Sequence, residues 1–274
     1  MAAKKTNRTT KPRPVALVTG GSSGIGLELA KQFAENDYDV IIVSENRQKL
    51  KDAALRIQRV SSGKVDIIVA DLAKPDGPVK VYNEVKKRRK EVNALVNNAG
   101  VGVFGEFGKE TKLKDELAMM QLNAVSVMHL TKLFLPQMLK RGYGKILITA
   151  SIVSITSNPL LTVYAGTKAF DYIFAEGLRQ EVKDKGITVT ALLPGATHTN
   201  FFPRAGMQKT ELWKNREKMA NPADVAKEAF KALMDNKDHV IAGFENKVQA
   251  FVADIMPKEF TAKNAKPKLV SSNK

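Results

Sequence analysis

The sequence contains no cysteine and only three histidines, His129, His198 and His239. Disulfides, thiolate nucleophiles and cysteine-ligated metal sites are therefore excluded, and histidines so far apart do not suggest a metal centre. No run approaches the ~18 consecutive apolar residues of a membrane-spanning helix, and the N-terminus lacks the apolar core of a secretory signal. We therefore expect a cytoplasmic protein whose chemistry depends on other side chains and needs no metal.

Negative charge is also scarce, because 44 lysines and arginines oppose 28 acidic residues and give a formal net charge of +16. Residues 1–14 carry five positive charges and no negative one, and residues 257–274 carry five against one. Both segments are poor in apolar residues, as disordered tails are. The internal basic run at residues 86–90 has no interleaved aromatic residues for base stacking. We interpret it as a solvated helix face and expect no specific nucleic-acid partner.

Short runs rich in β-branched and aliphatic residues alternate with longer segments of helical period. Such continuous apolar runs are typical of strands covered on both faces, and their alternation with helices indicates a parallel sheet. Residues 15–256 show no internal repeat, linker or composition shift, so the sequence predicts one doubly wound α/β domain of the Rossmann type in three layers. The expected strands are residues 15–19, 40–44, 65–70, 94–97, 145–150, 187–193 and 239–242.

A glycine-rich turn directly follows the first expected strand and precedes a helical pattern. Glycines allow a sharp turn and a close approach of the backbone to a pyrophosphate, and a helix N-terminus attracts phosphates. A tight turn without ligand shows the same composition, and the spacing departs from the G-x-G-x-x-G of the general dinucleotide motif. The candidate phosphate-binding residues are Gly20, Ser22, Ser23, Gly24, Ile25 and Gly26.

Tyr164 and Lys168 are four residues apart, so a helix places them on one face. An ammonium stabilises a nearby phenolate, and we expect Lys168 to lower the pKa of Tyr164 from its free value of ~10. Outside such a context, a pair of this kind is usually a surface pair. Ser151 follows the fifth expected strand, thirteen residues before Tyr164, and either holds a substrate oxygen or caps a helix.

Taken in order, these motifs resemble the short-chain dehydrogenase/reductase family over nearly the whole folded length. The spacing Thr-Gly-x-x-x-Gly-x-Gly at residues 19–26 and the Tyr-x-x-x-Lys pair both match it. The resemblance implies an NAD(P)-dependent enzyme that oxidises an alcohol or reduces a carbonyl, with Tyr164 as acid/base. It also implies that Ser151 holds the substrate oxygen and that Lys168 bonds the nicotinamide ribose. Asn123, expected within a long helix, matches the residue that holds a water in a proton relay.

Further family motifs imply the rest of the cofactor site. An Asp-Leu pair follows the third strand, where the family contacts the adenine, and Asn-Asn-Ala-Gly ends the fourth, where the family packs the sheet against the cofactor. A Pro-Gly turn after the sixth strand leads to two threonines that match those holding the nicotinamide carboxamide. The implied residues are Asp71, Leu72, Asn98, Ala99, Gly100, Pro194, Gly195, Thr197 and Thr199.

The choice between NAD and NADP depends, in the family, on the end of the second strand. Ser44 takes the usual acidic position, and Glu45 the usual place of an arginine that binds the 2′-phosphate. A carboxylate at Glu45 repels a phosphate and can accept from a ribose hydroxyl, which favours NAD. Arg47 can still fold back to a phosphate, and Glu45 can simply face solvent. The cofactor is therefore expected to be NAD or NADP, with a lean to NAD.

The segment after the Pro-Gly turn closes the substrate pocket in this family, and here it is rich in apolar residues. We expect a hydrophobic or bulky substrate, although the same aromatic side chains can instead merely pack the lid. The expected pocket residues are Val153, Leu160, Leu161, Phe201, Phe202 and Trp213.

An apolar stripe at helical spacing occurs near the end of the sequence. It can pack on its own domain, form a homo-oligomer contact, or touch a membrane surface together with the basic tail. We favour self-packing or a contact in a dimer or tetramer. The stripe consists of Val248, Phe251, Val252, Ile255 and Met256.

The alternative function is a non-catalytic dinucleotide-binding regulator or nucleic-acid-associated protein on the same fold, since fold alone does not fix function. Its support is the basic charge. A pure binder has no need of a proton donor beside the nicotinamide, and the four implied active-site residues are all present. The sequence therefore predicts an enzyme.

Overall fold

The computed structural model describes residues 12–243. Within this range, parallel strands form one seven-stranded sheet in the order β3-β2-β1-β4-β5-β6-β7. Each expected strand overlaps an observed one, and the predicted doubly wound α/β fold is confirmed. The strands are β1 (Val15–Thr19), β2 (Asp39–Ser44), β3 (Val65–Val69), β4 (Val92–Asn97), β5 (Gly144–Thr149), β6 (Ile187–Leu193) and β7 (His239–Ile241).

Helices connect successive strands, as crossovers between parallel strands require. Most are α-helices, together with one π-helical segment and three short 3-10 turns among the described residues. The α-helices are α1 (Gly24–Glu35), α2 (Arg47–Gln58), α3 (Gly77–Lys87), α4 (Leu113–Met120), α5 (Ser126–Arg141), α6 (Thr162–Val182), α7 (Phe201–Arg204), α8 (Glu211–Lys214) and α9 (Pro222–Met234). The π-helical segment is η1 (Gln121–Val125), and the 3-10 turns are η2 (Ile152–Ile155), η3 (Lys183–Lys185) and η4 (Arg216–Lys218).

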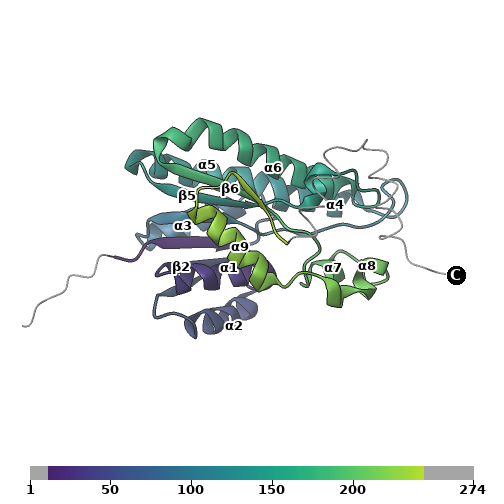
Figure 1. The fold of residues 1–274 in the computed structure, drawn as a ribbon, viewed down its shortest axis with the longest axis horizontal. Coiled ribbons are helices and arrows are strands. Elements are labelled where there is room, and N and C mark those ends of the chain that lie inside the picture. Colours follow the sequence, from purple (N-terminus) through teal and green to yellow (C-terminus); the bar gives the residue numbers. More distant parts are fainter. Residues whose placement is uncertain (1–11, 244–274) are drawn as a thin grey trace, which may run out of the picture.

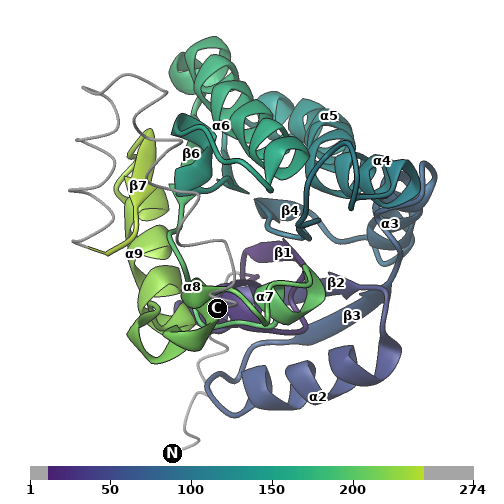
Figure 2. The same cartoon turned by 90° about the vertical axis from the view of Figure 1, so that its right-hand side faces the viewer.

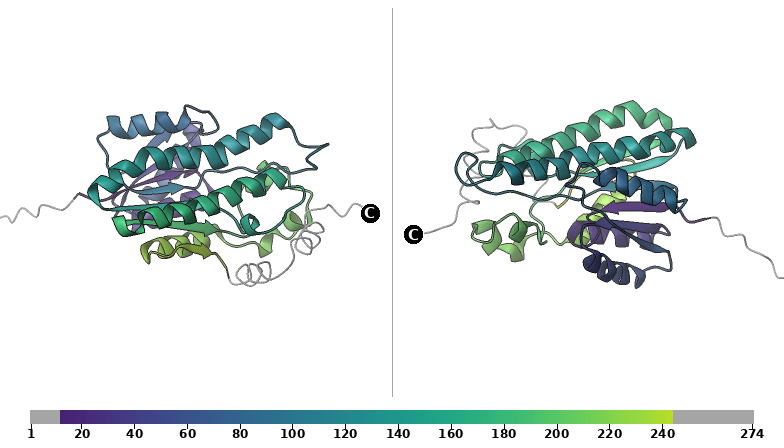
Figure 3. Two further views of the ribbon diagram at one scale, coloured as in Figure 1. Left: turned by 90° about the horizontal axis from the view of Figure 1, so that it is seen from above. Right: turned by 180° about the vertical axis from the view of Figure 1, so that it is seen from behind.

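Two helical layers cover the sheet (Figures 1 and 2). Helices α3, α5 and α6 lie side by side on one face (Figure 3), where Phe134 and Leu178 belong to a buried cluster with Leu17. On the other face, α1, α2 and α9 bury side chains such as Phe33 against Val18. Because neighbouring residues of β1 point to opposite layers, and both layers are apolar, the strand needs an unbroken apolar sequence.

Part of the internal basic run is paired with carboxylates of the fold. Arg88 lies 3.6 Å from Asp66 of β3 and 3.7 Å from Glu84 of α3. Lys90 lies 3.2 Å from Asp39 at the start of β2. Arg88 and Lys90 therefore link the end of α3 to the edge strands β3 and β2.

Several expectations concern residues outside the described range. The basic tails, the apolar stripe from Val248 to Met256 and the domain end at residue 256 lie wholly or largely there, and they stay predictions. In the part of the chain that is described, no helix combines the length and apolar character needed to cross a membrane.

The functional end of the sheet is set by the neighbours β1 and β4, which are adjacent in space but not in sequence. In such sheets a crevice opens at the carboxyl ends of the strands where the order reverses. The Thr19 hydroxyl donates to the carbonyl of Val96 at 3.2 Å and accepts from the N–H groups of Asn98 at 2.9 Å and Ala99 at 3.0 Å. This one side chain ties the two strand ends together at the crevice.

Replacing Thr19 by valine keeps its shape but leaves the N–H groups of Asn98 and Ala99 without their acceptor. An unsatisfied buried group costs ~1–3 kcal/mol, so we expect Thr19→Val to lower the free energy of unfolding by ~2–4 kcal/mol in urea denaturation. Thr19→Ser keeps the hydroxyl and is the matched control, with an expected loss of ~1 kcal/mol for one methyl group. A Thr19→Val variant as stable as the wild type would contradict this role.

Candidate active site

A cleft of about 980 Å³ opens at the carboxyl ends of the strands. This volume is at the upper end of the ~300–1,000 Å³ typical of ligand sites. The structure brings together in its wall most of the residues predicted for the cofactor and the chemistry. Those that line it are Gly20, Ser22, Ser23, Gly24, Ile25, Gly26, Ser44, Glu45, Asp71, Leu72, Asn98, Ala99, Gly100, Ser151, Tyr164, Lys168, Pro194, Gly195, Thr197 and Thr199.

The glycine turn between β1 and α1 leaves no room for side chains. Gly20 has φ +66°, and a Cβ added at Gly26 would lie 2.4 Å from both the Gly20 carbonyl oxygen and Asn98 Nδ2. Ser23 precedes α1, but its side chain makes no capping hydrogen bond. The first N–H groups of α1 are therefore available to an anion in the cleft.

The end of β2 presents a carboxylate to the cleft. Ser22 Oγ donates to Ser44 Oγ at 3.2 Å, which joins the glycine turn to this strand end. Glu45 is exposed and lines the cleft, whereas Arg47, the first residue of α2, is exposed and does not line it. The structure thus places Glu45, and not Arg47, at the border of this part of the cleft.

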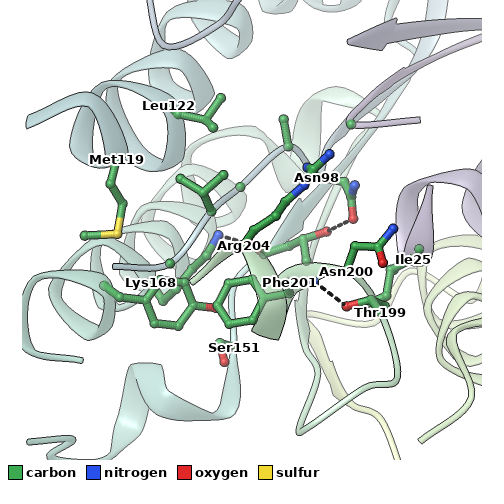
Figure 4. A pocket seen from close by; sticks show the side chains of 18 of the residues that line it. Ile25, Asn98, Met119, Leu122, Ser151, Lys168, Thr199, Asn200, Phe201 and Arg204 are labelled. Atoms are coloured by element: carbon green, nitrogen blue, oxygen red, sulfur yellow. Dashed lines mark hydrogen bonds between the residues drawn. The ribbon is translucent and has the colours of Figure 1, made fainter. Parts of the chain in front are cut away.

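The segment after β6 crosses the cleft opposite the glycine turn. A Cβ added at Gly24 would lie 3.1 Å from Thr199 Cγ2, so the two segments are close. Thr199 Oγ1 accepts from the N–H of Phe201 at 3.3 Å, and Thr197 Oγ1 donates to the Gly195 carbonyl at 3.0 Å. These bonds hold the predicted carboxamide-binding residues in a defined turn before α7 (Figure 4).

Tyr164 and Lys168 lie near the start of α6 and are buried, with 8% and 4% of their surface exposed. Ser151 is the N-cap of η2, where its Oγ accepts from the Val153 N–H at 3.4 Å, and it lies close enough to Tyr164 to lower the pKa of that phenol. The ring of Tyr164 lies against Phe201, with 5.2 Å between ring centroids. The expected shared face is therefore observed, and Ser151 completes a cluster of three polar side chains at the cleft wall.

The pKa of Tyr164 is raised, contrary to our expectation from the sequence. Burial raises it most, because a phenolate loses its hydration there. The Lys168 ammonium and the nearby Ser151 hydroxyl lower it, and Asp171 raises it further. Lys168 thus acts in the predicted direction, but the predicted net lowering is wrong.

Lys168 connects α6 to the end of β5. Its Nζ donates to the Thr149 carbonyl at 2.7 Å and to Asp171 Oδ2 at 2.9 Å. Burial lowers the pKa of Lys168, but the charges of Asp171 and Tyr164 raise it more, so the net direction is upward. The ammonium form is therefore favoured at the cleft wall.

Asn123 lies in the π-helical segment η1, between α4 and α5, and not in the regular helix that the sequence predicts. Single π turns inside helices occur often at functional sites. The wider turn is compatible with an asparagine side chain that bonds to groups outside its own helix.

The Asn123 side chain is fully buried and does not line the cleft. Its Nδ2 donates to the Val101 carbonyl at 2.9 Å and to Thr167 Oγ1 at 3.1 Å, and its Oδ1 accepts from the Val101 N–H at 3.0 Å. A Cβ added at Gly100 would lie 3.4 Å from Asn123 Oδ1 and 3.6 Å from Lys168 Nζ. Asn123 and Lys168 therefore both border the space beside Gly100.

Apolar side chains surround the Tyr164 end of the cleft. Of the predicted pocket residues, Val153, Leu161, Phe201 and Phe202 line it. Leu160 and Trp213 do not line it. They pack on a buried cluster, most of whose members also line the cleft, which consists of Met119, Leu161, Tyr164, Phe202, Ala205 and Met207.

Comparison with known proteins supports the resemblance seen in the sequence. A sequence model described as short chain dehydrogenase matches residues 14–210. The chain belongs to the short-chain dehydrogenase family.

The sequence of this short-chain dehydrogenase is similar to those of several curated proteins. It is 34% identical over 184 residues to the very-long-chain 3-oxoacyl-CoA reductase of Anas platyrhynchos, which covers 65% of this chain and 58% of the relative. It is 28% identical over 254 residues to dehydrogenase/reductase SDR family member 7B of Mus musculus, covering 90% of this chain and 78% of that one. The chain thus spans less than two thirds of the length of the reductase.

Solved structures show the same fold. A short-chain dehydrogenase from Sphingobium yanoikuyae in complex with NADPH has a TM-score of 0.78 at 24% identity, covering 95% of this chain and 98% of that chain. A short-chain dehydrogenase from Streptomyces avermitilis has a TM-score of 0.76 at 26% identity, covering 90% of this chain and 93% of that chain.

Some cleft residues of this short-chain dehydrogenase were not predicted. Met119, Leu122 and Asn158 belong to this group, as does Arg204, an exposed residue of α7 (Figure 4). No motif singles out these positions, because their approach depends on how α4 and α7 pack. In residues 12–243 no group of three histidine or acidic side chains could hold a metal ion.

Replacing Gly26 by alanine would place a methyl group 2.4 Å from the Gly20 carbonyl, a backbone atom that cannot simply rotate away. We expect Gly26→Ala to weaken NADH or NADPH binding at least ~10-fold, a loss of ~1.4 kcal/mol, in fluorescence titrations. Gly177→Ala in α6 is the matched control, because its added Cβ meets nothing within 4 Å. Wild-type affinity in Gly26→Ala would argue against binding at this turn.

Proposed function

We propose that this chain is an NAD(P)-dependent oxidoreductase that interconverts an alcohol and a carbonyl compound, with Tyr164 as its acid/base. The observation that carries the proposal is the buried cluster of Tyr164, Lys168 and Ser151 at the wall of the cleft that also contains the glycine turn. A protein that only binds a dinucleotide needs no proton donor there. The family relation supports the oxidoreductase class over the alternative of a regulator.

The chain's own residues fit a dinucleotide along this cleft. The glycine turn and the uncapped start of α1 suit a pyrophosphate. Asp71 and Leu72 would border the adenine, Thr197 and Thr199 the carboxamide, and Lys168 the nicotinamide ribose. When bound, the nicotinamide would donate or accept the hydride.

In carbonyl reduction, Ser151 would donate a hydrogen bond to the carbonyl oxygen and hold it beside Tyr164. Tyr164 would transfer its phenolic proton to that oxygen as negative charge develops on it, and the Lys168 ammonium would stabilise the phenolate that remains. Alcohol oxidation would run the same proton transfer in reverse. The raised pKa of Tyr164 keeps the phenol protonated at neutral pH, which suits the reducing direction.

Asn123 would act on the proton path and not on the substrate. It is buried and its side chain fixes the backbone at Val101, next to Gly100 of the cleft. Asn123 Oδ1 and Lys168 Nζ both lie beside Gly100, which supports the relay role that the resemblance implies.

The substrate we propose is a carbonyl compound with an apolar body. Phe201, Phe202, Leu161 and Met119 line the cleft on the side of Tyr164 and offer an apolar wall. The Anas platyrhynchos relative is named as a very-long-chain 3-oxoacyl-CoA reductase, which makes 3-oxoacyl thioesters the first substrates to screen. Bulky ketones form the second set.

The expected homo-oligomer and the cytoplasmic location stay proposals. Large apolar side chains are exposed on α4 and α6, two helices that contact each other, and they support a contact between copies. They are Leu113, Leu117, Met120, Phe170 and Ile173.

Tyr164→Phe removes the phenolic proton and keeps the ring. We expect kcat for carbonyl reduction to fall ~10²- to 10⁴-fold, the usual contribution of a general acid, with little change in the Kd for the dinucleotide. Tyr82→Phe on α3, whose hydroxyl accepts from Gln137 away from the cleft, is the matched control. Full turnover in Tyr164→Phe would exclude Tyr164 as the proton donor.

The cofactor proposal is NAD, and it rests on Glu45. Glu45→Arg replaces a repelling carboxylate by a cation that pairs with a phosphate, so we expect NADPH binding to tighten relative to NADH by ~10-fold or more. Glu45→Gln removes the negative charge without adding a positive one. Comparing it with Glu45→Arg therefore separates the effect of lost repulsion from the effect of the added cation. Titrations are run in moderate salt, because a protein of net charge +16 attracts any phosphate. Tighter binding of NADPH than NADH by the wild type would overturn the preference for NAD.

A further inference from the structure

Asp171 places a carboxylate directly beside Lys168, and none of the roles above uses it. The two residues are three apart on α6, and Asp171 Oδ2 lies 2.9 Å from Lys168 Nζ. Asp171 is fully buried, and its second oxygen, Oδ1, has no hydrogen-bond partner among the described residues. An ionised carboxylate in such a place is costly unless a cation compensates it. Lys168 is that cation.

We propose that Asp171 is a positioning residue that fixes the Lys168 ammonium at the cleft wall and keeps the Tyr164 and Lys168 pair in its proton-donating form. This inference rests on the proposed function, because it assigns a role within the same site.

The number of hydrogen-bond donors on the Lys168 ammonium supports this role. A lysine ammonium has three N–H donors and no acceptor. The Thr149 carbonyl, at 2.7 Å, and Asp171 Oδ2, at 2.9 Å, take two of them. The remaining N–H is the one that Lys168 can direct to Tyr164 or to a ribose hydroxyl. Without Asp171, the ammonium would have two free donors and no fixed rotation.

The total charge of Asp171, Lys168 and Tyr164 also supports this role. With Asp171 ionised, Lys168 charged and Tyr164 protonated, the three side chains sum to zero. Loss of the tyrosine proton then creates a net negative charge in a buried place, which is unfavourable. Without the carboxylate the same proton loss would neutralise a buried positive charge. The negative charge of Asp171 thus favours the protonated forms of both partners.

The groups around this unit leave Asp171 as the source of negative charge. From β5 the Thr149 carbonyl faces Lys168, from η1 the Asn123 amide lies beside Gly100, and the Ser151 hydroxyl lies near Tyr164. None of these titrates near neutral pH. The described charged residues that line the same cleft, apart from Lys168 itself, are Glu45, Asp71, Asp115 and Arg204. Glu45, Asp115 and Arg204 are exposed to water, and Asp71 Oδ1 accepts from the Ala73 N–H.

The test is an ultraviolet titration of the Tyr164 phenolate, which needs neither substrate nor turnover. The signal of Tyr164 is obtained by subtracting the titration of Tyr164→Phe in the same background. Asp171→Asn removes the charge at nearly constant shape, and we expect the phenolate midpoint to fall by about 1 pH unit or more, the usual effect of one close charge. We also expect the high-pH limit of carbonyl reduction to move down with it.

Glu181→Gln is the matched control, because it removes the same charge from an exposed position in the last turn of α6. It should leave the Tyr164 midpoint unchanged. If Asp171→Asn does not fold, Asp171→Ser removes the charge from a smaller side chain and is titrated in its place. An unchanged midpoint in the folded variant, or an equal shift in Glu181→Gln, overturns the proposal.

The outcomes also separate this inference from the proposed function. A midpoint that falls only in the Asp171 variant supports the coupling even if the protein reduces no carbonyl, in which case the proposed function fails. Carbonyl reduction with an unmoved midpoint supports the function and rejects Asp171 as its positioning residue.

Discussion

The buried ammonium of Lys168 is the interaction on which the rest of the site depends. It donates to the carbonyl of Thr149, whose hydroxyl donates to Asn98 Oδ1 at 3.3 Å, and Asn98 Nδ2 donates to the carbonyl of Thr19 at 3.1 Å. This chain of hydrogen bonds runs from α6 across the ends of β5 and β4 to β1. It joins the cluster of Tyr164 and Lys168 to the glycine turn, so hydrogen bonds fix the two ends of the cleft relative to each other. The cost of burying the ammonium is offset by Asp171.

The fold could be predicted from the sequence because its signals are local. Strands covered on both faces require continuous apolar runs, and the seven runs all fall on observed strands. The same holds for the two strongest site motifs. Glycine at position 26 is required by contacts within one turn, and the helical period alone places Tyr164 and Lys168 on one face.

Other features depend on contacts between distant segments and could not be predicted. The π turn at Asn123 follows from bonds to Val101 and Thr167, which a helical pattern does not reveal. The direction of the Tyr164 pKa shift follows from how deeply α6 is covered, and burial outweighs the nearby ammonium. Asp171 is a different case, because its spacing from Lys168 already indicates a shared helix face. The spacing does not show that Asp171 is buried, and its burial is what makes its charge act strongly on Lys168.

The proposed reaction moves a hydride between a nicotinamide and a carbonyl carbon. The most direct measurement is to incubate the wild-type chain with a 3-oxoacyl thioester and with NADH or NADPH carrying deuterium at C4 of the nicotinamide, each face labelled separately. Mass spectrometry of the product then locates the label. We expect one deuterium on the new carbinol carbon from one of the two labelled faces. Alcohol product without deuterium from either face, or tight dinucleotide binding with no product from any thioester or ketone tested, would contradict it.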